Sequence, residues 1–78
     1  MIPLYGFLEG DTIGLLVLAE ETDSVRDLAA KLQQAARVRV ARAPRVKVVF
    51  QGRPLDPDTT VAQTDLGPLD RFDVVQDG

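Results

Sequence analysis

The topology of the chain can be inferred from one stretch, Val46-Lys47-Val48-Val49-Phe50-Gln51-Gly52-Arg53-Pro54-Leu55. Every second residue from Val46 to Phe50 is apolar, which predicts a strand with one buried face. The next four residues have the composition of a turn, and Leu55 is expected to be a buried anchor after it. The stretch therefore predicts a strand that ends in a tight reversal of the chain.

Three further strands are predicted around this stretch, at residues 4–8, 12–19 and 71–76. Gly10 supplies the turn of a hairpin between the first two. Period-two alternation divides the second strand into one face with Ile13, Leu15, Val17 and Ala19 and another with Leu16 and Leu18. Both faces are apolar, and an exposed sheet face does not need two leucines.

A helix is predicted between the second strand and the central stretch. Ser24 followed three residues later by Asp27 resembles a capping box. One helical stripe then carries the apolar residues Val25, Leu28, Ala29, Leu32 and Ala36. The helix is predicted to end near Ala36, because Val38 and Val40 interleaved with arginines favour extended chain. The residues expected to face water are Lys31, Gln33 and Gln34.

The order of these elements defines the fold class. A helix between two strands favours a right-handed crossover, with the helix on one face of a mixed sheet. The prediction is a single α+β domain over residues 1–78, a β-grasp with a sheet of four to five strands packed on one helix.

The composition excludes several kinds of site. The chain contains neither cysteine nor histidine, which removes disulfides, thiolate nucleophiles, the commonest general base and the commonest transition-metal ligands. The aspartate pairs Asp56/Asp58 and Asp70/Asp73 suit turn chemistry and solubility better than catalysis. No catalytic residue, cofactor or metal site is expected. No apolar run is long enough to cross a bilayer, so a cytoplasmic domain is expected.

Charge is concentrated in one segment. Residues 37–55 carry six bases and no acid, whereas the flanking segments carry six acids each. One interpretation is a solvated segment that its neighbours neutralise. The other is a basic edge that docks on an acidic partner. Nucleic-acid binding is not expected, because the whole chain has a net charge of −3 and only Phe50 lies near these bases as an aromatic.

The chain resembles ubiquitin along almost its whole length. The resemblance rests on the Gly10 hairpin, the helix pattern and the stretch from Phe50 to Leu55. It implies that Leu8, Val49 and Val75 match an apolar recognition patch. Conjugation through the C-terminus is not expected, because the sequence ends Val75-Gln76-Asp77-Gly78 and lacks a two-glycine tail.

A more specific resemblance is to the gamma (B) subunits of bacterial multicomponent toluene and alkene monooxygenases. It is carried by Pro3, Glu9, Asp11, Leu16-Val17, Asp23-Ser24, Ala29, Lys31, the basic stretch that ends in Pro44, Leu66-x-Pro68 and Asp73-Val74-Val75. It implies a non-catalytic accessory subunit that docks on the large subunit of a diiron hydroxylase. The alternatives are a stand-alone ubiquitin-like interaction protein, such as a type VII secretion accessory factor, or a protein modifier or sulfur carrier.

Partner binding is therefore predicted on the surface of the domain. The candidate residues are Leu8, Leu16, Leu18, Arg37, Arg39, Arg42, Arg45, Val49 and Val75. One of two apolar faces, either Leu8 with Val49 and Val75 or the separate strip of Leu16 and Leu18, would form the contact, and the arginines would add a charged rim. No membrane or nucleic-acid partner is expected.

Overall fold

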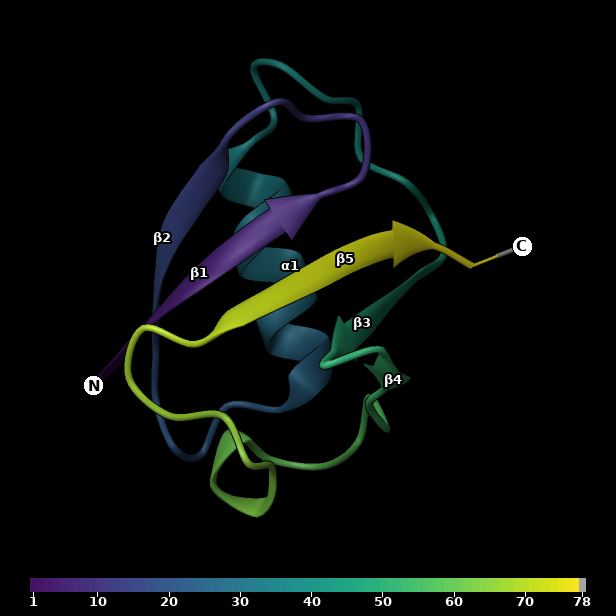
Figure 1. The fold of residues 1–78 in the computed structure, drawn as a ribbon. Helices are drawn as coiled ribbons and strands as arrows, with labels where there is room; N and C mark the ends of the chain where they lie inside the picture. The colour runs from purple at the N-terminus through teal and green to yellow at the C-terminus, as the bar shows by residue number, and fades with distance from the viewer. Residues whose placement is uncertain (78) are drawn as a thin grey trace.

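The computed structural model describes residues 1–77. The elements are β1 (Ile2–Leu8), β2 (Gly14–Ala19), α1 (Val25–Ala35), β3 (Val46–Phe50), β4 (Arg53–Pro54), the 3-10 turn η1 (Val61–Gln63) and β5 (Arg71–Gln76). The five strands form one sheet in the order β2-β1-β5-β3-β4, and α1 crosses one face of it (Figure 1). β1 and β5 are parallel, and the other pairs are antiparallel. The predicted mixed sheet on one helix is confirmed.

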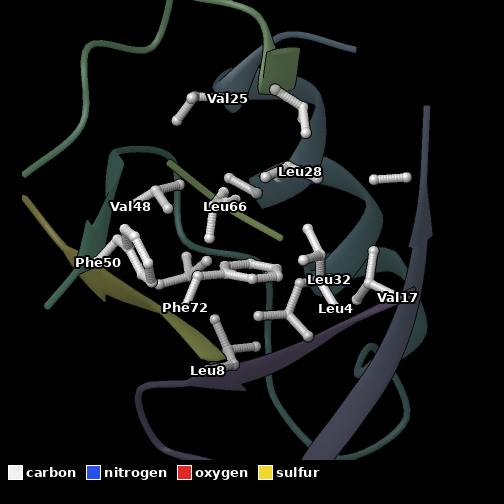
Figure 2. Packing of buried hydrophobic residues seen from close by; sticks show 14 of the residues in the cluster. Leu4, Leu8, Val17, Val25, Leu28, Leu32, Val48, Phe50, Leu66 and Phe72 are labelled. Atoms are coloured by element: carbon white, nitrogen blue, oxygen red, sulfur yellow. The ribbon is translucent and has the colours of Figure 1, made fainter. Parts of the chain in front are cut away.

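The core lies between α1 and the inner face of the sheet (Figure 2). Its largest fully buried side chains are Phe72, Leu4, Leu28, Leu32, Val25, Val61 and Val74. All five residues of the predicted helical stripe are buried. The alternation of β3 is also confirmed, because Val48 and Phe50 are buried and Val46 packs against them. Leu55 is half-buried and contacts the same cluster.

Helix α1 begins as its sequence predicts. The Ser24 hydroxyl accepts a hydrogen bond from the Asp27 N–H at 3.0 Å, and the Asp27 carboxylate accepts one from the Ser24 N–H at 3.0 Å. This capping box satisfies two donors at the helix start. After Ala36 the prediction of extended chain is wrong. The N–H groups of Arg39 and Val40 both bond the Ala36 carbonyl, so the chain turns back on the helix end.

Two other predictions of exposure are wrong. Gln33 is buried, because its side-chain oxygen accepts a hydrogen bond from the Ala43 N–H at 2.8 Å and ties the loop after α1 to the helix. Ile13, expected on the core face of the second strand, is 47% exposed. β2 begins only at Gly14, so Ile13 lies in the hairpin connection, where alternation does not apply.

Asp56, Asp58 and Asp70 lie outside the strands, and Asp73 lies on β5. The Asp56 carboxylate accepts from the Asp58 N–H at 2.9 Å, and the Asp70 carboxylate accepts from the Gly67 N–H at 2.8 Å. Within residues 1–77, acidic side chains do not gather in threes as a metal site would require. No helix in that range has the length and apolarity needed to span a membrane.

Candidate docking surfaces

The face of the sheet that points away from α1 carries an apolar patch over β1 and β2. Tyr5 lies directly opposite Leu16, and Pro3 lies opposite Leu18. Tyr5, Leu16 and Leu18 are 44%, 55% and 50% exposed. We call Pro3, Tyr5, Leu16 and Leu18 the outer-sheet patch. A small domain that exposes clustered apolar side chains in this way presents a surface suited to a protein partner.

One more exposed leucine adjoins the patch. Leu69 is 58% exposed, and its N–H bonds the Pro3 carbonyl at 2.6 Å. Its φ of 66° lies in the left-handed region, which is unfavourable for a leucine. The loop before β5 thus holds an apolar side chain at the margin of the patch in a conformation that local sterics disfavour.

A charged group separates this patch from the rest of the outer face. The Arg71 guanidinium lies 3.9 Å from the centre of the Phe7 ring and donates to Asp73 at 3.0 Å. The Phe7 ring lies over Gly14, where a side chain would collide with it. Aromatic ring, guanidinium and carboxylate form a line along β1 and β5, and the outer-sheet patch ends at that line.

The residues expected to match the ubiquitin recognition patch divide between two environments. Val49 and Val75 lie on the outer face and are half-buried. Leu8 is only 7% exposed, so its expected place on the surface is wrong. β1 continues through Leu8, which stays in phase with Leu4 and pairs with the buried Val74 (Figure 2). The hairpin turn begins only after Leu8, and the side chain therefore belongs to the core.

Arg39 does not supply the expected charged rim. Its guanidinium donates to both oxygens of the Asp11 carboxylate, at 2.9 to 3.2 Å, and joins the β1–β2 hairpin to the segment after α1. The Asp11 side chain is 2% exposed. These hydrogen bonds hold the pKa of Asp11 below its ordinary value. Arg37 is exposed, and its guanidinium donates to the Gln34 carbonyl at 2.8 Å.

Arg42 and Arg45 lie on a different surface from the outer-sheet patch. They line a groove of about 560 Å³ between α1 and β3. β2 is at one edge of the sheet, and β1 and β5 lie between it and β3. Arg42 and Arg45 therefore do not surround Leu16 and Leu18, because the strand order places the two groups at opposite sides of the sheet. Their role as a charged rim beside Val49 and Val75 stays a prediction.

Two features of these surfaces were missed in the sequence. Tyr5 belongs to the outer-sheet patch, and the alternation of Leu4, Gly6 and Leu8 with Pro3 and Tyr5 was the available signal. The groove had no such signal. It depends on which strand is at the edge of the sheet and on where the loop after α1 crosses, and both are set by tertiary structure.

Among residues 1–77, the sheet order and the single helix that crosses one face define a ubiquitin-like β-grasp domain. The family model for toluene-4-monooxygenase system protein B (TmoB) matches residues 1–76. The chain belongs to this family. The predicted resemblance to monooxygenase gamma subunits is confirmed, and with it the prediction of an accessory monooxygenase component.

Solved structures agree with this assignment. A chain of the toluene 4-monooxygenase HD complex with the inhibitor 4-bromobenzoate superposes with a TM-score of 0.90 at 26% identity, covering 97% of this chain and 98% of that one. Ubiquitin of Caldiarchaeum subterraneum gives 0.80 at 13% identity, covering 99% and 94%. A chain from a study of molecular mimicry of SUMO in DNA repair gives 0.80 at 24%, covering 95% and 89%. The last two show the fold alone. No curated protein matches the sequence.

Proposed function

We propose that this chain is a non-catalytic accessory subunit that docks through its outer-sheet patch on the large subunit of a diiron monooxygenase hydroxylase. The observation that carries the proposal is the exposure of Tyr5, Leu16 and Leu18 side by side on a sheet whose other face already holds the core. Support for the partner comes from the similar chain of the toluene 4-monooxygenase HD complex.

The non-catalytic role is inferred from how the acidic side chains are used. Asp11, Asp23 and Asp58 are in ion pairs, and Asp27 caps the helix. General acid–base catalysis needs a carboxyl group free to meet a substrate in a pocket. We therefore place the oxidation chemistry on the hydroxylase, and this chain contributes binding surface.

The proposal expects genes for a diiron hydroxylase beside this one, and its test is assembly of this chain with that hydroxylase. Leu16→Glu places a charge in the middle of the patch and should weaken binding by about tenfold or more, which corresponds to roughly 1.4 kcal/mol. Ile13→Glu is the matched control, because Ile13 is 47% exposed and lies outside the patch. Binding is measured by co-purification and by interferometry, and circular dichroism checks the fold.

The result expected is loss of assembly for Leu16→Glu alone. Equal binding of Leu16→Glu, Leu18→Glu and the unaltered chain would reject the patch as the docking surface. Failure of the unaltered chain to bind the neighbouring hydroxylase would reject the partner. A secretion ATPase in place of hydroxylase genes next to this one would favour the alternative of a type VII secretion accessory factor.

A further inference from the structure

The edge of β3 that faces away from β5 is only partly covered. β4 pairs with β3 at Val49 and Phe50, and the Leu55 N–H bonds the Val48 carbonyl at 2.8 Å. Beyond that point the chain leaves the sheet. The Pro57 carbonyl accepts from the Arg26 N–H at 3.0 Å, which holds the chain at the start of α1 instead of beside Val46.

Backbone groups of β3 are consequently left without partners. The Arg45 carbonyl accepts from the Asp77 N–H, so Arg45, Lys47 and Val49 direct their backbone groups toward β5. By alternation, Val46 and Val48 direct theirs toward the opposite edge. Within residues 1–77, the N–H and C=O of Val46 and the N–H of Val48 have no hydrogen-bond partner. Such groups are a template for another strand.

The groove beside this edge has an apolar floor, on which the side chains of an extended chain could pack. Its floor is apolar on both sides, with Ala29 and Ala30 from α1 facing Val46 and Val48 from β3. The opposite edge of the sheet differs, because the Lys31 ammonium on α1 donates to the Leu18 carbonyl of β2 at 3.1 Å. That bond occupies a backbone acceptor of the β2 edge, whereas, within the described residues, the backbone groups of Val46 at the β3 edge stay open.

The charge around the groove indicates what chemistry it accepts. Arg42, Arg45 and Lys47 line it, and within residues 1–77 none of the three is in a salt bridge. One acid in that range, Asp77, lines the groove, and Arg26, which also lines it, is paired with Asp58. An incoming strand would present alternate side chains to the apolar floor and to these bases.

We propose that the α1–β3 groove binds an extended segment of a partner protein in which acidic and aliphatic residues alternate, and that this segment adds a strand to the β3 edge. Its backbone would pair with Val46 and Val48, its aliphatic side chains would pack on the floor, and its carboxylates would meet Arg42, Arg45 and Lys47. Main-chain pairing supplies affinity in this mode of recognition, and the side chains supply specificity.

The probe is a short, blocked peptide in which aspartate and valine alternate, added to the full chain and followed by two-dimensional amide NMR. Saturable shifts are expected at Val46–Val48 and along α1 at Ala29, Ala30 and Gln33. The combined variant Arg42→Glu and Arg45→Glu should weaken binding by about tenfold or more. Arg37→Glu is the matched control, because Arg37 is an exposed arginine of the same segment that does not line the groove.

Two altered peptides test the charge recognition and the backbone pairing separately. Lysine in place of aspartate should abolish binding, and N-methylation of the valines, which removes backbone donors without changing charge, should weaken it about tenfold or more. Equal binding of the N-methylated peptide would overturn strand addition. Absence of shifts at millimolar peptide, or equal binding of the lysine peptide, would overturn the proposal as a whole.

Sedimentation of the chain without peptide tests whether a second copy of the chain occupies the β3 edge instead. Self-association that shifts the same β3 amides would show that a second copy takes the edge, and would overturn the proposal. The outcome is independent of docking through the outer-sheet patch. Leu16→Glu should bind the peptide as the unaltered chain does, so failure of hydroxylase docking and failure of peptide binding are separate results.

Discussion

The two faces of one sheet differ in burial in this domain. The inner face packs Leu4, Phe72 and Val74 against α1, and all three are fully buried. The outer face carries Tyr5, Leu16 and Leu18, each about half exposed. Both sets are apolar, and Leu4 and Tyr5 are even neighbours on β1. Apolar character therefore does not identify the core here, and only the position of the helix distinguishes residues that hold the fold from residues available to a partner.

The largest effect is expected from truncation of the inner face. Phe72→Ala removes the largest fully buried side chain and should lower the free energy of unfolding by about 4 kcal/mol. That is most of the stability of a domain this small. Urea unfolding gives the measurement, with Tyr5→Ala as the outer-face control. A loss below about 1 kcal/mol for Phe72→Ala would mean that the two faces do not differ as the packing indicates.

The next largest effect on stability is expected when a glycine on each face of the sheet is replaced by alanine, which adds one methyl group. A Cβ at Gly6 would lie 2.9 Å from Leu32 and Phe72 side-chain carbons, and those side chains are fully buried and cannot move aside. Gly6→Ala should therefore cost about 1–3 kcal/mol.

Gly14→Ala is the outer-face counterpart. A Cβ there would lie 2.5 Å from the Phe7 ring, but Phe7 is half-buried and its ring can swing toward solvent. Its loss of stability in urea should be the smaller of the two. A larger loss for Gly14→Ala would show that the Phe7–Arg71 arrangement is as rigid as the core.

A smaller effect on stability is expected from the ion pair between Asp11 and Arg39, which joins the β1–β2 hairpin to the segment after α1. The lowered pKa of Asp11 means that its ionised form stabilises the folded state. This contribution is present above the unfolded pKa of about 3.9 and is lost as pH falls through the lower folded pKa. Asp11→Asn should be less stable than the unaltered chain at neutral pH, and the difference should shrink in acid below about pH 4.

Thermal melts at several pH values give that measurement. Asp65→Asn, at an exposed acid, serves as the control. A stability difference between Asp11→Asn and the unaltered chain that stays constant down to strong acid would contradict a charge-dependent role for Asp11.

The smallest effect on stability is expected at the outer-sheet patch. Leu16→Ser and Leu18→Ser should each change the free energy of unfolding by no more than about 0.5 kcal/mol, because exposed residues contribute little to the core. Val17→Ser provides the sharpest contrast, since Val17 lies between them on β2 and is 4% exposed. If all three substitutions destabilise the domain equally, the outer patch is part of the folding core and is not held in reserve for a partner.

The features that could be predicted are those set by residues close together in the sequence. Alternation and the helical stripe located the strands and α1, and Ser24 with Asp27 located the helix start. The failures arise where tertiary contacts override local pattern. Gln33 is polar and helical yet buried, because Ala43 returns across it. Leu8 is buried, because the register of β1 against β5 carries it inward.

The site could be predicted only in part. The residues of the outer-sheet patch on β2 follow from alternation within one strand. Their separation from Arg42 and Arg45 depends on strand order, which the pattern of each strand does not contain. The groove depends on the chain turning away from the β3 edge at Pro57, whose carbonyl bonds the Arg26 N–H. These two residues are 31 positions apart in the sequence. The pattern within one strand thus indicates which of its residues are exposed, whereas the arrangement of residues from different elements follows from tertiary structure.

The parallel pair at the centre of the sheet has a consequence for how the domain forms. β1 and β5 are adjacent, with Leu8 paired to Val74 across nearly the whole described chain. β5 also joins the β1–β2 hairpin to β3 and β4. Closing so long a loop is slow, so we expect β1 to pair with β5 only after the β1–β2 and β3–β4 hairpins have formed. Because β5 lies between the early hairpin and β3, the sheet cannot be completed until this last strand has been made, whereas α1 is available to the hairpin earlier.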